Sequence, residues 1–172
     1  MIYIALAFIT GFLVKLTDDI IEHKRKFLFK DSEILFGALY GMLIGVMISN
    51  FPAIAPLWIG VTSGVLLAGK IDHRAHFMGI FFIILASLVL GVGSVSWALI
   101  AIFSLVSFGE EKLNDIADKV RNNNVFFRLL RLRPLVEISC LATSIYLGKP
   151  DIFIAILCFD IGYYLARKGS DL

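Results

Sequence analysis

Long stretches of uncharged, mostly apolar residues dominate this chain, and short segments between them hold nearly all of the charges. The first uncharged stretch covers residues 1–14, the second residues 34–69 and the third residues 77–109. The second and third are too long for one membrane crossing, which takes about 20 residues. Turn-forming residues interrupt both, SNFPAIAP at 49–56 and GVGS at 91–94, so each stretch predicts a helical hairpin.

We expect these stretches to be helices because a backbone surrounded by lipid must satisfy its own hydrogen bonds. With two apolar stretches nearer the C-terminus, seven helices are expected, at about residues 2–16, 33–49, 54–69, 76–91, 95–108, 134–148 and 151–167. A helix of about 16 residues reaches about 24 Å, which is short for a hydrocarbon core of about 30 Å. The predicted fold is an all-α integral membrane protein with seven short transmembrane helices in a single domain, residues 1–172.

The composition supports a membrane environment. Hydrophobic residues make up 59% of the chain, charged residues 17%, and the mean hydropathy is +0.87. Soluble domains have about 45–50% apolar and about 25% charged residues, so much of this surface is expected to face lipid. The net charge of +2 is too small to indicate binding of nucleic acid. The expected partners are membrane lipids.

The distribution of basic residues predicts the orientation. If the N-terminus lies outside and the helices alternate, fifteen of the 16 lysines and arginines fall in inner segments and only Lys149 lies outside. This matches the positive-inside rule and places the C-terminus in the cytoplasm, which we expect of a protein in the plasma (inner) membrane. The carboxylates follow the same pattern, so any chemistry is expected at the cytoplasmic boundary.

The segment VFFRLLRLRP (125–134), between the fifth and sixth expected helices, alternates bulky apolar residues with arginines. This pattern is typical of an amphipathic helical segment that lies in the membrane interface and touches anionic head groups. Arg128 and Arg131 are alternatively candidates for binding the phosphate of a lipid substrate.

An acidic cluster follows the first helix in DDIIE (18–22). On a helix, Asp18, Asp19 and Glu22 share a side, and like charges at that spacing repel each other. A divalent cation such as Mg²⁺, which is bound by a few carboxylates together with phosphate oxygens, would reverse that effect. The alternative is a solvated helix end with the basic segment 23–26 as counter-charge.

A second acidic cluster lies in EEKLNDIADKVRNNN (110–124). Glu111, Asp115 and Asp118 form one stripe on a helix, and they are further candidate ligands for Mg²⁺. The alternative is an amphipathic interfacial helix in which Asp115 and Lys119 form an ion pair.

The connection between the third and fourth helices, AGKIDHRAHF (68–77), concentrates polar side chains of several kinds. Lys70 and Arg74 suit the binding of phosphate. Asp72 or His73 is the candidate catalytic base.

Two acids, Glu137 and Asp160, fall inside expected helices. Ionisable groups at membrane depth are costly and are functional candidates by default. They would serve the inner site or an ion or proton pathway; the alternative is a structural role as partners of Lys15 or Lys70.

Two motif-level resemblances bear on function. DDIIE (18–22) and NDIAD (114–118) resemble the paired aspartate-rich motifs of UbiA-type membrane prenyltransferases, which implies Mg²⁺ and a prenyl diphosphate at the cytoplasmic face. The positions of Asp19 and Asp72, with GKID (69–72) similar to GxGD, resemble prepilin peptidases, which implies an aspartyl protease.

The main functional hypothesis is a membrane-embedded, Mg²⁺-dependent enzyme that acts on a phosphorylated or prenyl-diphosphate lipid from the cytoplasmic face. One alternative is an intramembrane aspartyl protease that uses Asp19 and Asp72 and does not depend on divalent metal. The other is a small ion- or proton-coupled transporter that uses Glu137 and Asp160, which would need a polar path across the whole bilayer.

Overall fold

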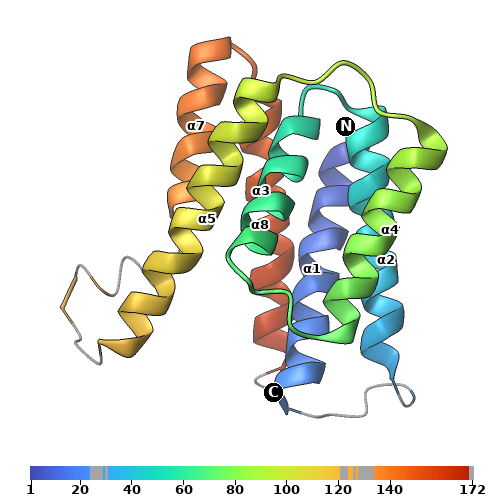
Figure 1. Cartoon of the computed structure of the whole chain (residues 1–172), viewed down its shortest axis with the longest axis vertical. Helices are drawn as coiled ribbons and strands as arrows, with labels where there is room; N and C mark the ends of the chain where they lie inside the picture. Colours follow the sequence, from blue (N-terminus) through green and yellow to red (C-terminus); the bar gives the residue numbers. More distant parts are fainter. Residues whose placement is uncertain (24–28, 30, 121–123, 126, 128–133, 171–172) are drawn as a thin grey trace.

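The computed structural model describes the chain except residues 24–28, 30, 121–123, 126, 128–133 and 171–172 (Figure 1). The described part is helical and contains no strand, which confirms the all-helical fold class. Its seven labelled helices are α1 (Ile2–His23), α2 (Ser32–Asn50), α3 (Ala55–Leu67), α4 (Arg74–Leu90), α5 (Trp97–Lys119), α7 (Leu135–Leu147) and α8 (Asp151–Ser170). The expected interfacial segment lies largely outside the described residues, and Arg128 and Arg131 lie wholly outside them.

Two helices extend further than the apolar pattern indicated. Helix α1 continues through DDIIE to His23, and α5 continues through the second acidic cluster to Lys119. The α5 extension consists mostly of residues that a helix accommodates well, such as lysine, glutamate, leucine and alanine. The α1 extension, TDDIIEH, has only one such residue, Glu22, yet the helix continues, so the appearance of charge does not by itself end a helix. In α1, the Thr17 hydroxyl donates a hydrogen bond to the Leu13 carbonyl at 2.8 Å. The side chain is therefore bonded within the helix and does not compete with the helix for backbone N–H groups.

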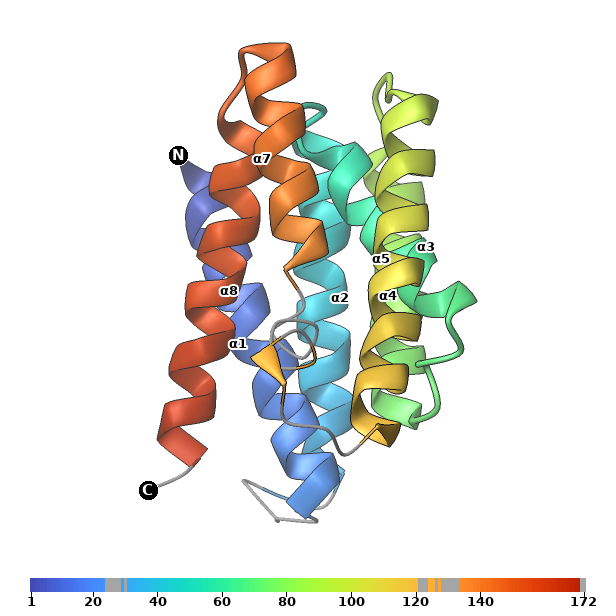
Figure 2. The same ribbon diagram turned by 90° about the vertical axis from the view of Figure 1, so that its left-hand side faces the viewer.

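The helices close into a ring. Helix α8 packs against α1, α1 against α2, α2 against α3, α3 against α5, α5 against α7 and α7 against α8, while α4 packs along α2 (Figures 1 and 2). The α2–α4, α1–α8 and α3–α5 pairs have the most extensive interfaces. The bundle therefore consists of three tight helix pairs that are joined by the α1–α2 interface, by α7 and by the α2–α3 contact.

Glycines form the closest crossings in all three tight pairs. A Cβ atom at Gly41 of α2 would lie 2.1 Å from the Gly79 carbonyl oxygen of α4, and one at Gly11 of α1 would lie 1.9 Å from the Phe159 carbonyl oxygen of α8. Gly60 and Gly64 bring α3 equally close to α5, and Gly37 and Gly45 extend the α2 row at four-residue spacing. Small residues at this spacing are typical of helix pairs in membranes, where close backbone approach supplies the packing energy.

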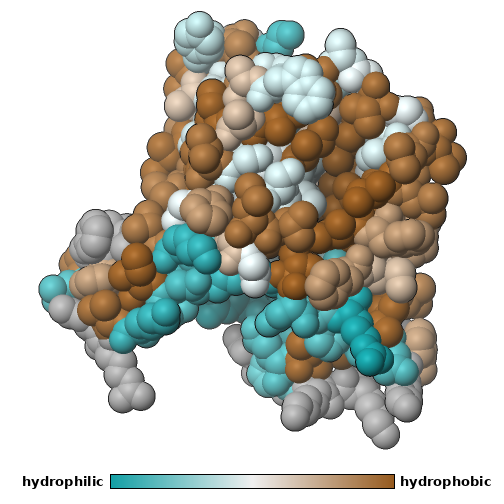
Figure 3. Space-filling view, in the orientation of Figure 1, coloured by the Kyte–Doolittle hydropathy of each residue, from teal (hydrophilic) through white to brown (hydrophobic). Residues whose placement is uncertain are grey.

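Polar and apolar surfaces are segregated along the bundle. In Figure 3 the hydrophilic side chains gather at the lower end, where α1, α3, α5 and α8 end and α2 and α4 begin, and the rest of the visible face is largely apolar. Large apolar side chains are exposed on the described helices, including Phe81 (56%), Leu88 (77%) and Leu105 (71%). Among the described helices, α2 alone is both long and apolar enough to cross a membrane, while α3, α4 and α7 are apolar but shorter.

Candidate functional site

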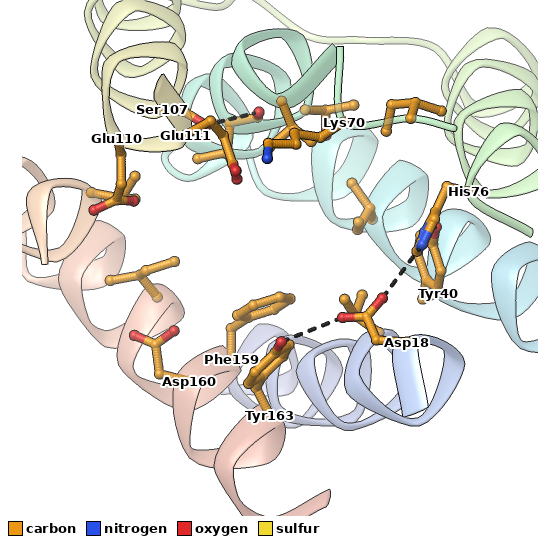
Figure 4. Close-up of a pocket in the computed structure, with 18 of the residues that line it drawn as sticks. Asp18, Tyr40, Lys70, His76, Ser107, Glu110, Glu111, Phe159, Asp160 and Tyr163 are labelled. Carbon is orange, nitrogen blue, oxygen red and sulfur yellow. Dashed lines mark hydrogen bonds and ion pairs between the residues drawn. The ribbon is translucent and has the colours of Figure 1, made fainter. Parts of the chain in front are cut away.

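A cavity of about 510 Å³ lies inside the ring (Figure 4). All seven described helices and the α3–α4 connection contribute side chains to its lining. The lining residues come from the central and C-terminal parts of α1, α3 and α5, from the N-terminal and central parts of α4, from the N-terminal part of α7, and from the middle of α2 and α8. The cavity therefore lies toward the polar end of the bundle.

The cavity lining is strongly acidic. Among the described residues, its carboxyl groups are Asp18, Glu110, Glu111, Glu137 and Asp160. Lys70 and His76 supply the basic nitrogens of the same lining. Glu110 and Glu111 are only 6% and 4% exposed, so their charges are held away from bulk solvent. Interactions between charges in such a partly desolvated site are stronger than at the protein surface.

One side of the cavity, which we call the acidic wall, carries Glu110 and Glu111 of α5, Glu137 of α7 and Asp160 of α8. The Asp160 carboxyl is hydrogen-bonded to Glu137 and is close enough to Glu110 for electrostatic interaction. Two carboxyl groups can share a hydrogen bond only when one of them carries a proton. This wall therefore favours protons or cations.

Glu110 also holds two helices together. Its Oε1 atom accepts a hydrogen bond from the backbone N–H of Leu135 at 2.6 Å. Leu135 begins α7, whose N-cap residue, Pro134, provides no side-chain cap of its own. A carboxylate at a helix N-terminus satisfies a free N–H group and interacts favourably with the helix dipole. Glu110 thus caps α7 from α5 and fixes one corner of the acidic wall.

The opposite side, which we call the hydrogen-bonded wall, consists of Asp18, Tyr40, His76 and Tyr163 from four different helices (Figure 4). The Tyr40 hydroxyl lies 3.0 Å from His76 Nδ1, and His76 Nε2 lies 3.4 Å from Asp18 Oδ1. The Tyr163 hydroxyl donates to Asp18 Oδ2 at 3.3 Å. These contacts form a continuous chain of polar groups along the cavity surface.

Asp18 is held in an environment that disfavours its charge. Burial raises its pKa from 3.8 to about 7, Lys15 opposes the rise, and Glu22 adds to it. The hydrogen bond from Tyr163 favours the ionised form but does not outweigh the loss of solvent. Asp18 can therefore change its protonation state near neutral pH.

Two lysine contacts tie α5 to the α3–α4 connection beside the cavity. Lys70 forms an ion pair with Asp115, and Lys112 donates a hydrogen bond to the Ala68 carbonyl at 2.9 Å. The hydrogen bond from Lys70 holds the pKa of Asp115 below its usual range. Asp115 does not itself line the cavity. It contacts a residue that does, because it forms the ion pair with Lys70.

The rest of the first acidic cluster lies outside the cavity. Asp19 Oδ1 pairs with Lys15 Nζ at 2.7 Å. One ligand atom from each of Asp19, Glu22 and His23 lies within 4.8 Å of the others, which is close enough for one metal ion. Asp19 is 6% exposed, whereas Glu22 and His23 are exposed. The predicted set of Asp18, Asp19 and Glu22 is thus divided between the cavity and the outer surface.

Other predicted site residues lie away from the cavity. Asp72 and Arg74 are exposed, and neither contributes to the cavity lining. His73 is the N-cap of α4, where its Nδ1 atom accepts a hydrogen bond from the Ala75 N–H at 3.3 Å. Asp118 is exposed near the end of α5. Their predicted roles in catalysis, phosphate binding or metal binding remain predictions.

Several polar residues of the cavity lining are not among the site residues predicted from the sequence, including Tyr40, His76, Glu110 and Tyr163. His76, the second histidine of DHRAH, lies three residues after His73 and lines the cavity, whereas His73 caps α4. The GALYGMLIG spacing at 37–45 is a signal for Tyr40, because it identifies the tight α2–α4 face on which this residue lies.

Comparison with known proteins returns no matching family model, curated protein or solved structure. The function is therefore argued from the cavity and its chemistry.

Proposed function

We propose that the chain is an integral membrane protein with its N-terminus outside and its polar end in the cytoplasm. Three observations support this: the exposed apolar surface, the glycine-mediated crossings, and the collection of ionisable groups at one end. A water-soluble bundle would have to expose side chains such as Phe81 and Leu88 to solvent, whereas in lipid their exposure is favourable.

We propose further that the cavity binds a divalent cation, Mg²⁺ in the cell, and acts on a phosphorylated or prenyl-diphosphate lipid from the cytoplasmic end. The observation that carries this proposal is the set of five carboxyl groups in one cavity of about 510 Å³. An anionic phosphate would be repelled by them alone, but Mg²⁺ binds carboxylate and phosphate oxygens together. The cation would then polarise the phosphoryl oxygen and stabilise the leaving group.

The proposed roles divide along the walls of the cavity. The acidic wall, with the predicted ligand Glu111 among its members, faces the cation. Lys70 is the cationic side chain of the lining and suits a phosphate oxygen. Deeper in the bundle the lining is apolar, with Ile44, Val61, Ile83, Ile156 and Phe159. These side chains suit the hydrocarbon part of a lipid that enters with its head group at the polar end.

The same distribution favours an enzyme that acts on a lipid phosphate over the two alternatives, a transporter and an aspartyl protease. A transporter needs polar groups along the whole crossing, but the inner part of this cavity is lined by isoleucine and valine. An aspartyl protease needs two aspartates close enough to share a proton. Asp19 pairs with Lys15 and Asp72 lies in an exposed connection, and neither lines the cavity.

The test uses the full chain in lipid nanodiscs. Mn²⁺, which has an electron-spin signal, replaces Mg²⁺ as the probe, and a panel of prenyl phosphates and diphosphates is assayed for release of phosphate or diphosphate. We expect Mn²⁺ binding, cation-dependent turnover of at least one lipid, and loss of both with chelator. Glu111→Gln should weaken Mn²⁺ binding at least tenfold. Glu33→Gln, outside the cavity, is the matched control. Turnover that persists in chelator would exclude the cation's role.

A further inference from the structure

The hydrogen-bonded wall has a definite donor and acceptor order. An ionised Asp18 can only accept hydrogen bonds. It accepts from Tyr163 at one oxygen, and in this ionised state a proton on His76 Nε2 makes the 3.4 Å contact with the other oxygen favourable. A neutral imidazole protonated at Nε2 has a free lone pair on Nδ1, and that lone pair faces the Tyr40 hydroxyl at 3.0 Å. With Asp18 ionised, Tyr40 therefore donates to His76, and the protonated Nε2 faces Asp18.

The backbone of α4 fixes the position of Tyr40. Its side chain is 7% exposed, and it crosses α4 at Gly79. A Cβ atom at Gly79 would lie 2.4 Å from the Tyr40 hydroxyl and 2.5 Å from its Cε2 atom. Any side chain larger than hydrogen at position 79 would displace the phenol, so the packing and the hydrogen bond to His76 specify the same geometry.

A hydroxyl, an imidazole and a carboxylate in this order resemble the arrangement by which enzymes activate a hydroxyl group. The hydroxyl exchanges the proton, the imidazole takes it, and the carboxylate orients the imidazole and stabilises its charged form. In this protein the three groups come from α2, α4 and α1, and all three line the cavity opposite the acidic wall (Figure 4).

We propose that Tyr40, His76 and Asp18 form a proton-transfer triad, in which the Tyr40 hydroxyl exchanges a proton with the group that attacks the lipid phosphate. This inference rests on the proposed function and assigns the acid–base role to His76. Asp18 and Tyr163 are positioning residues, because they act through the imidazole. Sequence reasoning had assigned the base to Asp72 or His73, neither of which lines the cavity.

In the proposed hydrolysis of a lipid diphosphate, the attacking water loses a proton through the triad. Water passes one proton to the Tyr40 oxygen while the Tyr40 proton moves to His76 Nδ1, and Asp18 stabilises the resulting imidazolium. The water oxygen bonds to the terminal phosphorus. The bond from that phosphorus to the bridging oxygen breaks, and its electron pair leaves with the lipid monophosphate. The proton on His76 then returns through Tyr40 to this leaving group or to solvent.

The kinetic test uses the full chain in nanodiscs with Mg²⁺ and the lipid of the panel that is turned over fastest. Tyr40→Phe and His76→Gln are each expected to lower kcat about 100-fold, with KM changed less than threefold. The double variant should be no slower than the slower single variant, because the residues act as one unit. Gly79→Ala should also lower kcat although the triad residues are retained. Tyr146→Phe and Gly109→Ala, which lie outside the cavity lining, are the matched controls.

A second measurement does not depend on the substrate. The chain has three histidines, so a His23→Gln/His73→Gln variant leaves His76 as the only one. We expect ¹⁵N NMR of labelled histidine to show a protonated Nε2 and an unprotonated Nδ1, and we expect Asp18→Asn to change the Nε2 signal. The opposite tautomer, an unchanged signal, or a His76→Gln variant within threefold of wild type would each overturn the triad. The expected tautomer without any lipid turnover would support the triad geometry and overturn the proposed function.

Discussion

The two walls of the cavity solve the problem of buried polar groups in different ways. On the hydrogen-bonded wall, Tyr40, His76, Asp18 and Tyr163 alternate as donors and acceptors, so the protein itself supplies the partners. The acidic wall instead gathers groups of the same kind, and Asp160 and Glu137 can share their hydrogen bond only with a proton between them. The difference matches the proposed division of roles, in which one wall moves protons and the other attracts a cation.

The largest effect is expected from breaking the helix crossing that carries Tyr40 and His76. Gly41→Leu places a side chain where a Cβ atom alone would lie 2.1 Å from the Gly79 carbonyl oxygen. The α2–α4 pair must then separate, at a cost of about 3 kcal/mol or more. Thermal unfolding in nanodiscs measures the loss. Gly109→Leu is the matched control, because its Cβ atom would meet open space. Equal losses in both variants would show that the crossing is not what matters.

A medium effect is expected from the titration of Asp18 on the hydrogen-bonded wall. In the folded protein the pKa of Asp18 is raised from 3.8 to about 7. Its contribution to the free energy of unfolding is therefore fully present below about pH 4 and is lost as pH rises toward 7. The upper limit is about 4 kcal/mol, and we expect about 2 kcal/mol because the side chain retains some solvent contact. The charged or titratable groups that face Asp18 are Lys15, Asp19, Glu22, Tyr40, His76 and Tyr163.

Unfolding measured from pH 4 to 8 tests this prediction. Asp18→Asn should remove most of the decline in stability between pH 4 and 7, whereas Tyr164→Phe, which changes an exposed neighbour of Tyr163, should leave it in place. If wild type and Asp18→Asn lose stability in parallel, the decline belongs to another group.

A smaller effect is expected on the acidic wall, where Glu110 combines a structural and an electrostatic role. Glu110→Ala removes the acceptor of the Leu135 N–H and should cost about 1–2 kcal/mol. Glu110→Gln keeps an oxygen acceptor, so it should cost less than about 1 kcal/mol while still weakening Mn²⁺ binding. Unfolding and Mn²⁺ titration of the same two variants separate the roles. If both variants lose the same stability, charge rather than the cap holds α7 to α5.

Hydrophobicity alone allowed the number and order of the described helices to be predicted, because apolar stretches of this length can satisfy their backbones only as helices. The ends were less accurate. The apolar pattern placed the end of the first helix at 16 and of the fifth at 108, whereas α1 reaches His23 and α5 reaches Lys119. A change from apolar to charged residues marks a change of environment, but the helix itself ends only where its local hydrogen bonding does.

The candidate site also divides into features that the sequence shows and features that only the tertiary structure decides. The sequence by itself supplied the chemistry: carboxylates, a lysine and histidines near one end of a very apolar chain, including five that line the cavity, Asp18, Lys70, Glu111, Glu137 and Asp160. Only the tertiary structure decided which side chains meet. Consecutive helical residues point about 100° apart, so Asp18 can face the cavity while Asp19 turns toward Lys15. Tyr40 and His76, 36 positions apart, become partners through the glycine crossing of α2 and α4.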